Sequence, residues 1–64
     1  MKTEYDPEAN ALYVKFSDDK VDRTEELRSG LMVDFDARGH IVGIEMLDAK
    51  TILSESALKS LAAA

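Results

Sequence analysis

Apolar and polar residues alternate along most of the chain, and short polar turns interrupt the alternation. Between residues 11 and 16, Leu12, Val14 and Phe16 fall on one side while Tyr13 and Lys15 fall on the other. A period of two is typical of a strand with one buried face. The pattern predicts five strands, at residues 2–5, 11–16, 21–27, 31–36 and 40–48.

Two of the intervening segments have the residues that tight turns require. In the segment from Asp6 to Asn10, Pro7 presets φ for a type I turn, and Asn10 tolerates the left-handed conformation that closes the loop. The segment 36–39 ends in Gly39, which supplies a positive φ at low cost and predicts a type I turn followed by a glycine bulge.

The periodicity changes after residue 51, where a short helix is expected. Ser54 is placed as a helix N-cap, and Glu55 follows in the first turn, where a negative charge suits the helix dipole. Leu53 and Leu58 have the spacing of a hydrophobic staple. The pattern therefore predicts a helix over 55–63. The expected fold is α+β: an antiparallel β-meander of four to five strands with one C-terminal helix packed on one face. All 64 residues would form a single small domain.

Strand alternation divides the apolar residues between two faces of the expected sheet. The face under the helix residues Leu58 and Leu61 is predicted to hold Leu12, Val14, Phe16, Leu31, Val33, Phe35, Val42, Ile44 and Met46. The opposite face is predicted to be an interaction surface made of Tyr5, Tyr13, Met32, Asp34, Ile41, Gly43, Glu45 and Leu47. This second set is too apolar for a fully solvated face, and contiguous exposed apolar surface marks contact sites. Gly43 lies inside a strand, where Tyr13 is expected to pack over it.

The small size of the domain suggests that part of its stability comes from a partner chain. A domain of 64 residues buries a small core, and such domains usually rely on disulfides, a metal or oligomerisation. The chain has no cysteine and one histidine, so disulfides, thiolate metal sites and multi-imidazole sites are excluded. A homodimer or a complex with a partner protein is therefore expected.

Charge narrows the class of partner. The formal net charge is −5, and nucleic-acid binding requires a basic surface that neutralises phosphates. Direct DNA or RNA binding is disfavoured, and a basic protein partner suits the chain better. Neither a signal peptide nor a membrane span is expected, so the sequence predicts a cytoplasmic protein.

The acidic residues raise two chemical alternatives. Asp34 and Asp36 before Gly39 are similar to the start of a calcium loop, but Arg38 places a cation where a ligand belongs, so neither a metal nor a cofactor is predicted. The alternative to an interaction module is a small oligomeric enzyme. Asp34 and Glu45 would then be acid–base residues in a pocket formed at a subunit interface.

Two segments carry a family resemblance. "EYDPEANALYVKF" followed by "GLMVDFDARGHIVGIEML" resembles the YuzE-like family of small prokaryotic proteins of unknown function, over roughly residues 4–48. Asn10 stands where the family pattern often has aspartate, and Phe35 where tyrosine is common. The resemblance implies no established activity. Members are often discussed beside small toxin-like genes, which suggests an antitoxin-like role with a basic partner.

Overall fold

The computed structural model describes residues 1–63, in which five strands precede two helices. The strands are β1 (Lys2–Asp6), β2 (Ala11–Lys15), β3 (Arg23–Arg28), β4 (Leu31–Phe35) and β5 (Ile41–Leu47), and the helices are α1 (Ala49–Ile52) and α2 (Glu55–Ala63). The predicted α+β class, with an antiparallel sheet and a C-terminal helix, is confirmed. The short helix α1 is an addition that the sequence pattern did not predict.

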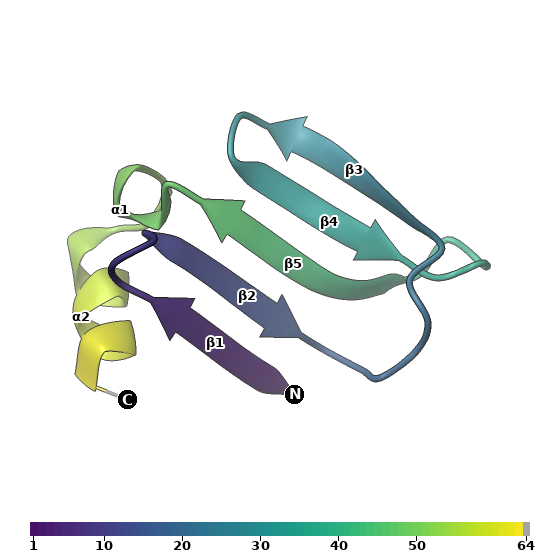
Figure 1. Ribbon diagram of the computed structural model, residues 1–64, viewed down its shortest axis with the longest axis horizontal. Coiled ribbons are helices and arrows are strands. Elements are labelled where there is room, and N and C mark those ends of the chain that lie inside the picture. The colour runs from purple at the N-terminus through teal and green to yellow at the C-terminus, as the bar shows by residue number, and fades with distance from the viewer. Residues whose placement is uncertain (64) are drawn as a thin grey trace.

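The strands form one antiparallel sheet in the order β1-β2-β5-β4-β3 (Figure 1). Three connections are hairpins, and residues 16–22 carry the chain from β2 across to β3 at the opposite edge. The last strand, β5, therefore lies in the centre, between β2 and β4. The charged segment predicted at 21–27 is an edge strand that begins at Arg23 and contains a register shift between Glu26 and Arg28.

The turn between β4 and β5 has the predicted geometry. The carboxylate of Asp36 accepts the backbone N–H groups of Arg38 and His40, both at 2.9 Å. Gly39 has φ of 85° and donates its N–H to the carbonyl oxygen of Asp36 at 3.0 Å. The N–H of His40, and in a smaller measure that of Arg38, lowers the pKa of the Asp36 carboxyl. Local hydrogen bonding therefore accounts for this acidic residue.

A second polar joint connects the first hairpin to α1. Asn10 and Asp48 both have left-handed backbones, with φ of 56° and 64°. The Asn10 amide group donates to Asp48 Oδ1, and its side-chain oxygen accepts the N–H of Lys50, both at 2.8 Å. The N–H of Ala49 donates to the backbone oxygen of Asn10 at 2.9 Å, and Ala49 is fully buried. Asn10 therefore caps a helix that lies far away in the sequence.

Helix α2 begins as predicted and lies at one end of the sheet (Figure 1). Ser54 Oγ accepts the N–H of Ala57 at 3.2 Å, which confirms the predicted N-cap. Leu61 lines a gap together with Thr3 and Tyr5 of β1. The helix therefore lies beside the β1 margin of the sheet, across this gap.

The core is formed on one side of the sheet, which we call the apolar face. The best-buried large side chains are Leu12, Val33 and Val42, which keep 3–5% of their surface exposed. The apolar face consists of Leu12, Val14, Leu31, Val33, Phe35, Val42, Ile44 and Met46. Phe16, which was predicted to belong to this buried set, is 44% exposed. That prediction was wrong because β2 ends at Lys15 and Phe16 already belongs to the crossover.

Replacement of Asn10 tests the joint between the first hairpin and α1. We expect Asn10→Ala to lower the free energy of unfolding by about 1–3 kcal/mol, because it removes two side-chain hydrogen bonds. Alanine would also have to adopt the positive φ of this position without the side-chain hydrogen bonds by which asparagine offsets the strain. Urea denaturation measures the change. Asn10→Gly is the matched control, because it loses the same bonds but tolerates the backbone, and its cost should be smaller. Wild-type stability for Asn10→Ala would contradict this account.

Candidate functional site

The face opposite the apolar face brings together most of the residues predicted for the interaction surface. Strand register pairs Tyr13 with Glu45 and Glu45 with Met32, and it pairs Gly43 with Asp34. Directly paired residues point to the same side of a sheet. The surface that we call the Tyr13 face therefore contains Ala11, Tyr13, Lys15, Met32, Asp34, Gly43, Glu45 and Leu47.

Tyr5 does not point to this face, contrary to the prediction. The register of the first hairpin pairs Tyr5 with Leu12, which places Tyr5 on the side of the apolar face. The prediction treated each strand's alternation separately. The geometry of the connecting loop sets the register between two strands, and a shift of one residue exchanges the faces.

Ile41 is also separated from the predicted cluster. Asp34 pairs with Gly43 but Phe35 pairs with Ile41, so the register shifts and Val42 is an extra residue on β5. Such a bulge interrupts the alternation of side chains. Ile41 lies opposite Phe35 at the margin of the sheet and is 51% exposed. The prediction that Ile41 shares a face with Gly43 was wrong because it assumed an unbroken strand.

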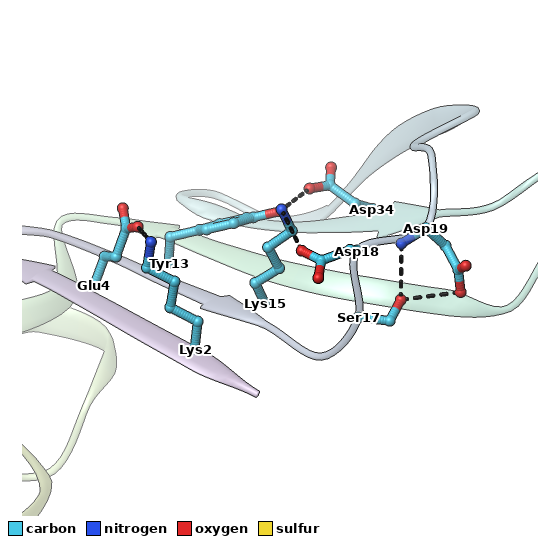
Figure 2. Close-up of polar contacts among 8 residues, drawn as sticks. All are labelled: Lys2, Glu4, Tyr13, Lys15, Ser17, Asp18, Asp19 and Asp34. Carbon is cyan, nitrogen blue, oxygen red and sulfur yellow. Dashed lines mark hydrogen bonds and ion pairs between the residues drawn. The ribbon is translucent and has the colours of Figure 1, made fainter.

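The centre of the Tyr13 face is a polar network that crosses the sheet. A Cβ atom at Gly43 would lie 2.8 Å from the Tyr13 hydroxyl, so the phenol lies directly over this glycine, as predicted. The Tyr13 hydroxyl donates to Asp34 Oδ2 at 3.1 Å (Figure 2). The Thr24 hydroxyl donates to Asp34 Oδ1 at 2.5 Å, and Asp34 is only 9% exposed. Tyr13 on β2 thereby reaches over β5 to Asp34 on β4, and Thr24 extends the network to β3.

The surroundings of Tyr13 keep its hydroxyl protonated. Burial is the main cause that raises the pKa of Tyr13, followed by the hydrogen bond to Asp34 and by the negative charges of Asp34, Glu45 and Glu4. Tyr13 is therefore a stable hydrogen-bond donor at neutral pH and is poorly suited to act as a base.

A shallow pocket of about 390 Å³ lies beside the Tyr13 ring. Its lining residues are Glu4, Tyr5, Asp6, Ala11, Leu12, Tyr13 and Glu45. Three of these carry carboxylates and none is basic. Lys2 pairs with Glu4 at 3.1 Å (Figure 2), but both side chains are largely exposed, and such surface pairs are weak. The pocket therefore offers negative charge next to an aromatic ring.

The two carboxylates considered for acid–base catalysis have different surroundings. Glu45 lines the pocket, whereas Asp34 does not, and both Asp34 oxygens accept bonds from hydroxyl groups. Within residues 1–63, no three His, Cys, Asp or Glu side chains gather closely enough to hold a metal ion. No helix in the same range has the length and hydropathy of a membrane span.

Comparison with known proteins gives one match. A family model described as "Protein of unknown function (DUF2283)" matches residues 2–50, which include all five strands and the start of α1. No significant match was found among curated proteins or solved structures.

Adding a methyl group at Gly43 tests whether Tyr13 needs the space above β5. We expect Gly43→Ala to lower the free energy of unfolding by about 1–3 kcal/mol, because the new Cβ would displace the phenol from Asp34. A double-mutant cycle with Tyr13→Leu, followed by urea denaturation, measures the coupling. The cost of Gly43→Ala should be smaller in the Tyr13→Leu background. Equal costs in the two backgrounds would show that the phenol is not the cause.

Alkaline titration tests the Tyr13–Asp34 bond. Because the folded-state pKa of Tyr13 is raised above 10.0, the unfolded chain loses this proton first as the pH rises. The contribution is complete below pH 10 and is lost as the pH rises through the folded pKa. We expect the urea midpoint to fall in that range, and Tyr13→Phe to reduce the fall. The control variant Tyr5→Phe should keep most of the fall in the urea midpoint at alkaline pH. An equal fall of the midpoint with pH in wild type and Tyr13→Phe would contradict the assignment.

Proposed function

From the premise that the chain belongs to the DUF2283 family of proteins of unknown function, we propose that it is a small acidic interaction module that binds a basic partner protein. The observation that carries this proposal is the pocket beside Tyr13, whose lining holds three carboxylates and no basic side chain. Its expected occupant is a positively charged side chain of the partner.

The chemistry of the pocket favours arginine. A guanidinium group presents five donors in a planar fork, and the carboxylates of Glu4, Asp6 and Glu45 supply acceptors around it. The same plane stacks on an aromatic ring, which the ring of Tyr13 provides. The bond to Asp34 holds that ring in place before any partner arrives. A preorganised side chain loses little conformational entropy on binding.

The overall charge supports the same class of partner. A net charge of −5 attracts a basic protein over a distance and speeds encounter. The resemblance to the YuzE-like family adds an antitoxin-like role to the proposal, with a small basic protein as the partner. A cytoplasmic location is part of this proposal.

The enzyme alternative receives less support. General acid–base catalysis requires a group that reaches the substrate, and Asp34 is engaged by Tyr13 and Thr24 away from the pocket. Glu45 alone would have to do the chemistry. We therefore assign Asp34 the role of positioning Tyr13, and Glu45 the role of contacting the partner.

An NMR titration tests the proposed binding. We expect a short arginine peptide to shift the amide signals of Tyr13, Glu45 and Glu4, and an acidic peptide of equal length to leave them in place. Glu45→Gln should weaken the arginine peptide about three- to tenfold, because it removes a charge that faces the ligand.

The matched control removes the same charge elsewhere. Glu55 lies on α2, outside the pocket, and pairs with Lys59 at 3.3 Å on the surface. Glu55→Gln should therefore leave the affinity nearly unchanged. Equal losses from the two variants would indicate attraction to the total charge alone, and signals that shift evenly along the chain would count against a site at Tyr13.

A further inference from the structure

The apolar face is only partly covered by the chain itself. Two rows of paired residues cross its central strands: Val14, Ile44 and Val33 in one row, and Leu12, Met46 and Leu31 in the other. Val14, Ile44 and Met46, all in these rows, remain half-buried. Both helices lie at one end of the sheet (Figure 1). Domains are normally built from at least two packed layers, and most of this face has no second layer.

The total surface area agrees with a missing layer. The chain exposes 4562 Å². Folded monomers follow a scaling law with mass, which gives about 4,100 Å² for 7.1 kDa. The chain thus exposes roughly a tenth more surface than a monomer of its size. No large side chain in the described residues is fully buried, as expected of a core that is still open on one side.

Charge decides what can cover this face. The rows of the apolar face hold no ionised side chain on β2, β5 or β4. At the β3 edge, Arg23 pairs with Glu25 at 2.7 Å and lies 4.4 Å from the centre of the Phe35 ring, so these two charges cancel. Arg28, the register partner of Leu31, places one positive charge at the margin of the face. An apolar surface whose central rows carry no charge fits a copy of itself, whereas two chains of charge −5 repel at any acidic surface.

The sheet edges are unsuitable for the same association. The edge strand β3 has the sequence RTEELR, is exposed throughout, and contains a register shift between Glu26 and Arg28. The edge strand β1 has the sequence KTEYD. Charged side chains and bulges on edge strands prevent pairing with another sheet. Association of two chains is therefore restricted to their faces.

We propose that a second copy of this chain covers the apolar face, so that two sheets pack face to face about a two-fold axis. Val14 and Ile44 would lie in the middle of the contact, and sheets packed in this way are about 10 Å apart. The same patch serves both copies, as a two-fold contact requires. The Tyr13 faces then point outward on opposite sides. If the proposed function holds, the dimer presents two binding pockets to basic partners.

The association is tested on the unmodified chain. Light scattering after size-exclusion chromatography should give twice the 7.1-kDa chain mass. In a mixture of ¹³C-labelled and unlabelled chains, isotope-filtered NOE spectra should show contacts between chains from the methyl groups of Val14 and Ile44, and none from Leu47 on the Tyr13 face. A monomer at the concentrations used for NMR would overturn the proposal. So would a dimer whose contacts arise from Leu47 and Met32.

A pair of charge variants gives a second readout. Val14→Lys places a charge in the contact and should weaken association by about a hundredfold or more. Leu47→Lys introduces the same charge at a position that is 46% exposed on the other face, and it should leave the dimer intact. Dissociation by both variants, or by Leu47→Lys alone, would refute the assignment of the face. Circular dichroism identifies a variant that has unfolded, in which case the NOE contacts decide. Failure of the peptide titration at Tyr13 would leave this dimer unaffected, since the two tests probe opposite faces.

Discussion

The Tyr13 side chain spans the centre of this sheet on its polar side. It starts on β2, lies over the bare backbone of Gly43 on β5, and reaches a carboxylate on β4. Thr24 extends the same network to β3. A side chain at position 43 would occupy the space that the phenol needs. The network thereby links four neighbouring strands, and it orients the ring that forms one wall of the acidic pocket.

Local patterns predicted most of the fold. Alternation identified the strands, and turn chemistry identified the loop at Asp36 and the cap at Ser54, because each depends on residues a few positions apart. The pairing of strands depends on distant contacts, so alternation gave the wrong face for Tyr5 and missed the bulge beside Ile41. The role of Asn10 was missed for the same reason, since its partners lie 38 and 40 residues away.

The two faces of the sheet differ in chemical character. One face collects apolar side chains, which supply the core, and its uncharged central rows suit contact with an identical surface. The other face keeps carboxylates near an aromatic ring. In the proposed arrangement, the acidic chain would associate with a second copy through one face and bind a basic partner through the other, without using one surface for two purposes.

The central place of β5 has a consequence for how the chain acquires its structure. During synthesis, the β1–β2 hairpin and the β3–β4 hairpin emerge first, yet neither pairs with the other. Isolated two-stranded hairpins are marginally stable in water. Both hairpins need β5 as a pairing partner, because β5 pairs with β2 on one side and with β4 on the other. The nascent chain therefore gains a stable sheet only after β5 is released, and a chain cut short before that strand would keep only two marginally stable hairpins.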